Sequence, residues 1–329
     1  MKLAIVILNW NGKALLEQFM PSVIEHSQGA DIYVADNASS DDSVTFVKTN
    51  FPTVKIIQNS ENGGYSKGYN DALKHIEADV YCLMNSDIEV THNWLLPIVE
   101  EFKNHQDTAI VQPKLLDYKN KSQFEYAGAA GGFIDKLGYP YCRGRIFTTI
   151  EQDHGQYDDR ADIFWASGAC IFIRKKVFET LGGFDESFFA HMEEVDLCWR
   201  AFNQGFKTKY IGASTVYHVG GATLQSNNPK KTYLNFRNSL FALVKNAEGN
   251  LSFLILSRLI LDGVAGIRFL LQFNGMHTLA IIKAHFSFYR HLRKLLNFRK
   301  LSFKRKNYYQ KHSIVASYYL KNCKTFNCL

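Results

Sequence analysis

The segment Tyr-Cys-Leu-Met-Asn-Ser-Asp-Ile-Glu, residues 81–89, decides how the rest of the chain is interpreted. Its first four residues form a short apolar run, which is typical of a strand buried inside a parallel sheet. The polar residues Asn85, Ser86 and Asp87 follow where that strand should end. Ligands of open α/β sheets bind at the carboxyl ends of the strands, and a carboxylate there can hold a divalent cation against phosphate oxygens. The same three residues could also form an Asx-type turn that only closes the strand.

Upstream of this segment, apolar strands alternate with helical patterns. The expected order is strand 2–8, helix 13–25, strand 32–35, a short helix from 44, strand 54–58, helix 68–76 and strand 79–84. This alternation favours βαβ units and a parallel sheet. The strand ends carry Asn9, Asp36 and the pair Asn62 and Gly63, so we expect these residues near Asp87 at one edge of the sheet. No dinucleotide glycine fingerprint follows the first strand and no P-loop lysine motif is present, which disfavours both of those classes.

The next part of the chain is less regular. We expect a helix at 93–102, a strand at 109–116 interrupted by Pro113, and a strand at 171–173 followed by a helix. The Gly- and Tyr-rich region 119–160 shows few periodic runs, so it is expected to form irregular loops that contact a substrate.

A second group of polar residues lies at Glu193, Glu194 and Asp196, at the start of a helix expected over 193–204. Acids favour a helix N-terminus, and Asp196 could pair with Arg200 four residues later, so a structural role is open. Three carboxylates in four residues also raise one another's pKa, which suits a general base. His218 follows a strand-like run, where it could be structural or could face a phosphate or a metal.

Composition and charge describe a folded protein with a basic tail. The chain has 329 residues, is 46% hydrophobic and carries a net charge of +7. After Asp262 there is no acidic residue, so the first 262 residues carry −6 and the tail +13, which indicates an anionic partner. The six cysteines lack paired spacing and the N-terminus resembles a strand, so we expect reduced thiols, no signal peptide and a cytosolic location.

The apolar stretch 251–273 is interrupted by Arg258, Asp262 and Arg268, which makes it a poor membrane span. Its spacing, and the mixture of aromatic and basic residues at 281–306, favour amphipathic helices that lie on a membrane. The alternative is a helical subdomain packed on the rest of the protein.

The motifs taken in order resemble the family-2 type of GT-A glycosyltransferases, especially the bacterial rhamnosyltransferase-like branch that builds surface polysaccharides. The matching motifs are IVILNWNG at 5–12, VADNASSD at 34–41, ENGGYSKGYN at 61–70, NSD at 85–87, SGA at 167–169, GFDE at 183–186, EEVDL at 193–197 and YHVGG at 217–221. The resemblance, which spans about residues 2–240, implies an α/β GT-A fold with a mixed, mostly parallel central sheet and a basic helical C-terminal region. It implies a catalytic domain at 1–225, with a nucleotide-binding half at about 1–90 and an acceptor half at about 91–225, followed by the C-terminal region 226–329.

The resemblance also implies roles for single residues. Its donor-binding set is Asn9, Asp36, Asn62, Gly63, Asn85, Asp87 and Arg237, the last beside Tyr233 and Asn238. Asp87 would be the last acid of the family's D-x-D motif and would bind Mg²⁺ or Mn²⁺, with His218 completing the site. Asn85 stands where the first acid of that motif often lies. The position of the catalytic base falls on Glu194, where the family usually has Asp, and Glu193 and Asp196 are the alternatives.

These roles imply an inverting, metal-dependent glycosyltransferase that moves a sugar from a nucleotide-sugar donor to a glycan or lipid-linked glycan. It would act in cell-surface polysaccharide synthesis at the cytoplasmic face of the membrane, with peripheral contact through the C-terminal region. A nucleotidyltransferase acting on a sugar phosphate is the alternative, although it normally needs a basic glycine-rich loop after the first strand. A nucleic-acid binder is disfavoured by the acidic balance of the first 262 residues.

Overall fold

The computed structural model describes residues 1–220 and 228–329. Its strands are β1 (Leu3–Asn9), β2 (Ala30–Asp36), β3 (Lys55–Gln58), β4 (Val80–Asn85), β5 (Ile88–Val90), β6 (Thr108–Asp117), β7 (Gly132–Ile134), β8 (Pro140–Cys142), β9 (Arg145–Ile146), β10 (Thr149–Ile150), β11 (Arg160–Ile163), β12 (Cys170–Arg174) and β13 (Lys207–His218). Its α-helices are α1 (Lys13–His26), α2 (Ser43–Asn50), α3 (Gly64–Leu73), α4 (Leu95–Asn104), α5 (Lys175–Thr180), α6 (Glu193–Asn203), α7 (Pro229–Asn246), α8 (Leu251–Leu271), α9 (Gly275–Leu301) and α10 (Ile314–Tyr319). Short 3₁₀ turns lie at Glu186–Phe188 and Phe326–Cys328.

Within the described residues, nine strands form the central sheet, in the order β11-β13-β6-β12-β4-β1-β2-β3 with β5 paired to β13. The strands β4, β1, β2 and β3 pair in parallel. β12 is antiparallel to both β4 and β6, while β6 and β13 are parallel again. The expected fold class, an α/β fold with a mixed central sheet, is confirmed.

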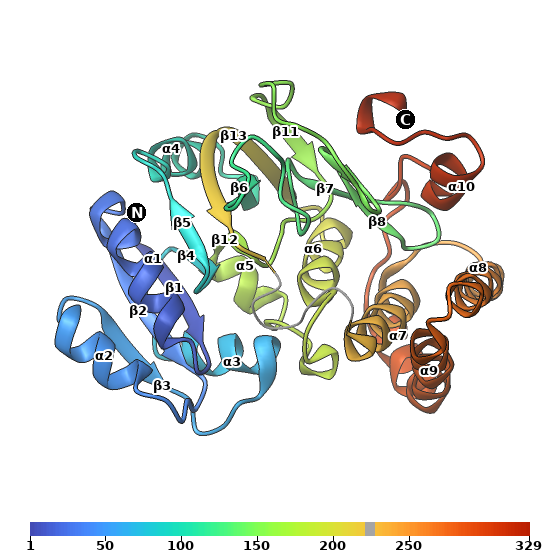
Figure 1. Cartoon of the computed structure of the whole chain (residues 1–329), viewed down its shortest axis with the longest axis horizontal. Helices are drawn as coiled ribbons and strands as arrows, with labels where there is room; N and C mark the ends of the chain where they lie inside the picture. The colour runs from blue at the N-terminus through green and yellow to red at the C-terminus, as the bar shows by residue number, and fades with distance from the viewer. Residues whose placement is uncertain (221–227) are drawn as a thin grey trace.

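Helices cover both faces of this sheet (Figure 1). Because side chains alternate along a strand, Ile5 and Ile7 of β1 pack with Leu16 of α1 in one core, while Val6 packs with Tyr69 of α3 in the other. Burial on both faces explains why the strands appear in the sequence as continuous apolar runs.

Two expectations for the middle of the chain are wrong. The region expected to form irregular loops contains β7, β8, β9 and β10, which make a second, four-stranded sheet. These strands are two or three residues long, too short for an alternating pattern to be visible. Pro113 does not interrupt β6. It lies opposite Ile211, beside the register shift before Thr215, and proline, which has no N–H group to donate, is tolerated at such an irregularity.

The C-terminal region lies at the end of the molecule opposite α1 and α2 (Figure 1). α7 packs against α6, and α8 and α9 pack outside α7. The expected boundary between residues 225 and 226 falls outside the described residues. Among the residues that are described, no helix combines the length and apolar character needed to cross a membrane.

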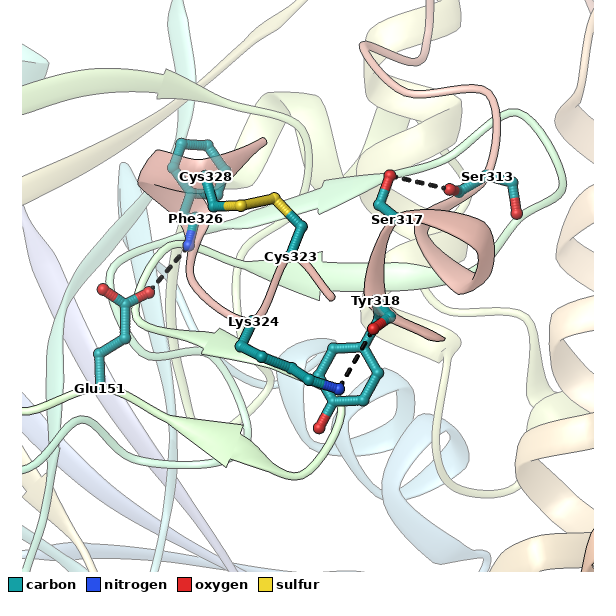
Figure 2. The surroundings of a disulfide bond; sticks show 8 residues. All are labelled: Glu151, Ser313, Ser317, Tyr318, Cys323, Lys324, Phe326 and Cys328. Carbon is teal, nitrogen blue, oxygen red and sulfur yellow. Dashed lines mark hydrogen bonds between the residues drawn. A yellow bond between two sulfur atoms is a disulfide. The ribbon is translucent and has the colours of Figure 1, made fainter. Parts of the chain in front are cut away.

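The last residues fold back onto the second sheet. Phe326 donates its backbone N–H to Glu151, at 3.0 Å, and its ring lies 5.1 Å from that of Phe133. Cys323 and Cys328 form a disulfide in this segment (Figure 2). This pairing differs from the expectation that all six cysteines are reduced, which rested only on their scattered spacing.

Candidate active site

Asn9 and Asp36 are the last residues of the neighbouring strands β1 and β2 and lie directly opposite each other in the parallel register. Both are buried, and Asn9 Nδ2 donates to Asp36 Oδ1 at 3.1 Å. The other Asp36 oxygen accepts from the backbone N–H of Ser39 at 3.1 Å. Asn9 Oδ1 has no hydrogen-bond partner among the described residues. This pair therefore places polar side chains, including the unpaired acceptor Asn9 Oδ1, at the sheet edge where ligands bind.

Asn62 and Gly63 lie at the N-terminus of α3, which begins four residues earlier than the expected helix. Asn62 Oδ1 accepts from Asn37 Nδ2 at 3.0 Å and from the backbone N–H of Gly64 at 3.1 Å. The amide contacts fix the loop that follows β3. Because helix N-termini carry unpaired N–H groups and partial positive charge, this end of α3 suits an anionic group of a ligand.

Asp87 and His218 meet at the carboxyl end of β4. β5 follows Asp87 at once and pairs with the end of β13, which places His218 opposite Ile88. The two side chains are buried, and His218 Nε2 lies 3.1 Å from Asp87 Oδ1 and 3.3 Å from Asn85 Nδ2. Behind the histidine, Glu125 Oε1 lies 3.2 Å from Nδ1.

The charges of this group are coupled. Burial alone would raise the pKa of Asp87, but the hydrogen bond and charge of His218 outweigh it and hold that pKa below its usual value. Burial would likewise lower the pKa of His218, but Glu125 and Asp87 raise it to about 10. The imidazole is thus held between two carboxylates.

These residues fit a divalent cation. A carboxylate and a neutral imidazole are common ligands, so a cation bound to His218 would have to displace the proton that Asp87 and Glu125 favour on its ring. Glu125 on the far nitrogen is the support that ligating histidines usually have. No group of three or more His, Cys, Asp or Glu side chains within the described residues is arranged to hold a metal ion by itself. An ion on Asp87 and His218 would therefore share its coordination with oxygens of a bound substrate, as Mg²⁺ commonly does.

Glu193 and Glu194 open α6 directly after a strained loop. Phe189, His191 and Met192 all have positive φ, between 62° and 71°, a conformation that non-glycine residues adopt at a cost. Burial, and the charge of Glu194, raise the pKa of Glu193 well above its usual value. Burial also raises the pKa of Glu194, to about 7. One oxygen of each carboxylate lacks a hydrogen-bond partner in the described part of the chain.

Two residues of α7 hold the strained loop in place. Asn238 Nδ2 lies within hydrogen-bonding distance of the carbonyl oxygens of Phe188, Ala190 and His191, at 3.0, 2.9 and 2.7 Å. Arg237 donates to the carbonyls of Ser187 and Phe188 at 3.0 and 3.1 Å. Arg237 was expected to contact the donor. In the structure it donates two hydrogen bonds to the segment that leads into this loop.

Asp196 belongs to a buried ion network. Its Oδ2 accepts from Arg200 at 2.8 Å, and its Oδ1 lies 2.9 Å from Lys245 Nζ and 2.7 Å from Asn246 Nδ2. Lys245 also pairs with Asp185 at 2.6 Å. Since both oxygens of Asp196 are engaged, its contacts are those of a residue that anchors α6 on α7.

The segment Ser167-Gly168-Ala169 lies between Asn85, beside the Asp87–His218 pair, and Glu194. The backbone N–H of Asn85 donates to the carbonyl of Ala169 at 2.9 Å. A Cβ atom at Gly168 would lie 3.7 Å from the Cβ of Glu194 and 3.0 Å from the hydroxyl of Tyr65. Asn85 and Glu194 therefore lie beside the same short piece of backbone, and the contact that favours glycine at 168 is the close one with Tyr65.

Sequence reasoning missed three residues at this site. Glu125 supports His218 but lies in the region expected to form loops, where a single acid carries no pattern. Tyr65, quoted in a motif but given no role, donates its hydroxyl to the carbonyl of Gly168 at 2.7 Å. Lys231, in the first turn of α7, has its pKa lowered by burial, against the opposing charge of Glu125.

Residues 4–182, more than half of the chain, match the model of the family described as Glycosyl transferase family 2. The chain belongs to this family. The resemblance inferred from the motifs is confirmed, and the chain is a nucleotide-sugar glycosyltransferase. This assignment decides against the nucleotidyltransferase and nucleic-acid-binding alternatives.

Relatives of this glycosyltransferase include rhamnosyltransferases and a hexosyltransferase of glycan biosynthesis. It is 23% identical over 233 residues to N-acetylglucosaminyl-diphospho-decaprenol L-rhamnosyltransferase of Mycobacterium tuberculosis, covering 66% of this chain and 75% of that one. It is 25% identical over 250 residues to the low-salt glycan biosynthesis hexosyltransferase Agl10 of Haloferax volcanii, covering 73% and 75%. The rhamnosyltransferase WbbL of Escherichia coli is 23% identical over 167 residues, covering 47% and 61%.

Solved structures share the fold. GalNAc-T7, solved with UDP, GalNAc and Mn²⁺, gives a TM-score of 0.56 at 16% identity and covers 74% of this chain and 47% of that one. The mannosyltransferase PcManGT of Pyrobaculum calidifontis, solved with GDP-Man and Mn²⁺, gives a TM-score of 0.53 at 11% identity and covers 91% and 84%. Both comparisons support the GT-A fold expected from the motifs.

Proposed function

We propose that this glycosyltransferase moves a sugar, with inversion, from a nucleotide-sugar to a glycan or lipid-linked glycan acceptor, with the help of Mg²⁺ or Mn²⁺. One observation carries the proposal: Asn85, at the start of the Asp87–His218 cluster, and Glu194 both adjoin the segment 167–169. The residues proposed to bind the donor diphosphate and a carboxylate of raised pKa therefore lie on either side of one short segment, which supports a shared site.

On the donor side, Asn9 and Asp36 would bind the nucleotide base, and Asn62 and Gly63 would lie beside the nucleotide-sugar. Asn85 would contact the same ligand, and Arg237 would act from α7. A cation on Asp87 and His218 would offset the charge that develops on the departing diphosphate. Lys231, in the first turn of α7 near Glu125, adds positive charge on the same side.

On the acceptor side, we assign the general base to Glu194, with Glu193 as the alternative. An acceptor hydroxyl is a weak nucleophile until a carboxylate takes its proton, and a base works best when its pKa lies near the working pH. The pKa of Glu194, raised to about 7, meets that condition. The full engagement of Asp196 with cations and an amide leaves it a role in positioning α6. A single base and a leaving group on opposite sides of the anomeric carbon give one displacement with inversion.

For the acceptor and the location, the proposal is supported by the names of relatives and by the charge of the chain. Relatives bear names of rhamnosyltransferases, one of them acting on a diphospho-decaprenol substrate, so we extend the proposal to a lipid-linked glycan in cell-surface polysaccharide synthesis. The basic C-terminal region would contact the anionic inner face of the cell membrane.

The test is the metal-dependent binding and cleavage of donors by wild-type protein and Asp87→Ala. With Mn²⁺ present, UDP, GDP and dTDP are screened by thermal shift, and sugar transfer or donor hydrolysis is then measured for the nucleotide that binds. We expect Asp87→Ala to lower turnover at least about 100-fold and to abolish the response to Mn²⁺ and to its removal by EDTA. Asp107→Ala, which removes an acid whose partner Lys207 lies on the surface, is the matched control. Unchanged activity in Asp87→Ala would reject the assignment.

A further inference from the structure

The outward face of α8 is apolar along its whole length. Six large side chains on one stripe are each more than half exposed: Phe253, Leu256, Ile260, Val264, Ile267 and Leu271. Two of the three charged residues of α8, Arg258 and Asp262, are buried on the opposite face and pair at 2.8 Å, while the third, Arg268, is exposed near the end of the helix. Asp262 also accepts from the hydroxyl of Tyr139 at 2.8 Å. A helix that borders water has the reverse arrangement, so the outward face of α8 is built for an apolar neighbour.

The apolar face continues around the turn into α9 and then changes character. Phe273 is 98% exposed at the turn, and Met276, Ile282 and Phe286 follow on the exposed side of α9. Beyond them, the exposed positions are mostly basic: Arg290, Arg293, Lys294 and Lys300. The hairpin of α8 and α9 therefore has an apolar outer face. Its open end, where α8 begins and α9 ends, is basic.

A pocket of about 600 Å³ lies at this open end. Its lining is Leu251, Arg293, Leu296, Asn297, Arg299, Lys300 and Lys304. Among these described lining residues there is no carboxylate. Arg299 is fixed by donating to the carbonyls of Val244 and Ala247 at 3.0 and 2.6 Å, so its position is set by the protein. Burial and the charge of Arg299 lower the pKa of Lys304, so the two cations lie close together, and Glu248 is an acid near enough to act on Arg299.

We propose that the α8–α9 hairpin docks into a bilayer of anionic phospholipid, with its apolar face among the acyl chains and its basic pocket around a headgroup phosphate. This inference rests on the proposed membrane contact and specifies the surface and the site that make it. A second copy of the chain is a poorer partner, because both copies carry an acid-free, +13 tail. A bilayer supplies an apolar layer bordered by anionic phosphates, which complements a hairpin with an apolar face and a basic pocket.

The test measures co-sedimentation of the full-length protein with vesicles of three compositions. They contain phosphatidylcholine alone, phosphatidylcholine with phosphatidylglycerol, or phosphatidylcholine with enough oleate to give the same surface charge. We expect the wild type to bind phosphatidylglycerol vesicles at least about 10-fold more tightly than the other two. The basic pocket would bind the phosphate group, and each basic residue adds to the attraction.

Two paired substitutions separate the parts of the surface. Arg293→Gln with Lys300→Gln should weaken binding to phosphatidylglycerol about 10-fold and remove the preference over oleate. Leu256→Gln with Ile260→Gln should weaken binding to all three compositions. The control combines Lys48→Gln with Lys103→Gln. These exposed lysines lie on α2 and α4, at a distance from the hairpin (Figure 1), so the same charge change should leave binding unaltered.

Two results would overturn the inference. Equal binding of the wild type to phosphatidylglycerol and oleate vesicles would show that the pocket does not recognise phosphate. An unchanged vesicle affinity in the Leu256 and Ile260 variant, together with loss of a dimer in analytical ultracentrifugation, would assign the face to a second copy. Because sedimentation needs neither donor nor acceptor, these results are independent of the proposed sugar transfer.

Discussion

Replacing Glu194 by Gln separates its catalytic and structural effects. The substitution keeps the size of the side chain but removes its charge and its ability to accept a proton as a base. If Glu194 deprotonates the acceptor, turnover should fall at least about 100-fold. In the wild type, the logarithm of kcat/KM should rise with slope one as the pH increases towards about 7, where the raised pKa of Glu194 lies, and then level off.

The same change should make the protein more stable at high pH. The pKa of Glu194 moves from 4.5 to about 7, and at about 1.4 kcal/mol per unit this shift corresponds to about 3 kcal/mol. The folded-state pKa is raised, so the unfolded chain loses its proton first, and stability falls as the pH rises from 4.5 to about 7. Because Glu194 is partly exposed, water screens part of this cost, and we expect Glu194→Gln to gain about 1–2 kcal/mol at pH 8.

Urea unfolding at pH 4 and pH 8 and initial transfer rates test both parts. The stability gain should be present at pH 8 and absent at pH 4, where the wild-type residue is already neutral. Glu193→Gln is the matched comparison, since it relieves the same buried pair but leaves Glu194 in place. A Glu194→Gln variant with wild-type turnover would refute the assignment, and a selective loss in Glu193→Gln would move the base to that residue.

Two other predictions concern the support of the site. Asn238→Ala leaves the carbonyls of Ala190 and His191 in the strained loop without this donor, so kcat should fall about 10-fold and stability by about 1–3 kcal/mol, whereas exposed Asn235→Ala on the same helix should change neither. Burial would raise the pKa of Asp185, but Lys245 lowers it to about 2; because the pKa is depressed, this stability is present above pH 4 and is lost as the pH falls towards 2. Asp185→Asn should therefore cost about 2 kcal/mol at pH 7 by denaturant titration, and an equal cost at pH 2 would contradict the ion-pair explanation.

Much of the structure of residues 1–90 could be predicted because its signals are local. Apolar runs define β1, β2 and β4, and parallel pairing then forces their ends to one edge, where Asn9 lies opposite Asp36 in register. Periodicity also placed α6 and α8 within a few residues of their observed bounds. Family membership could be inferred because several weak motifs occur in one order.

Contacts between distant segments could not be predicted in the same way. Glu125 reaches His218 only because the chain after β6 turns back alongside Leu115 and because the end of β6 pairs with the end of β13, and no local pattern marks that meeting. The second sheet consists of strands too short to show alternation. The disulfide joins two cysteines of a C-terminal segment whose position depends on packing against the second sheet.

The role of α7 connects the site to the rest of the C-terminal region. One residue, Asn238, holds the loop that precedes Glu193 and Glu194, and the next, Ser239, accepts from Arg258 of α8 at 2.6 Å. At the other end of α7, Arg299 of α9 donates to the carbonyl of Val244. The hairpin and the strained loop are thus both bonded to α7. A membrane that orients the hairpin would consequently orient the base, so an acceptor anchored in the same bilayer would approach Glu194 from a constant direction.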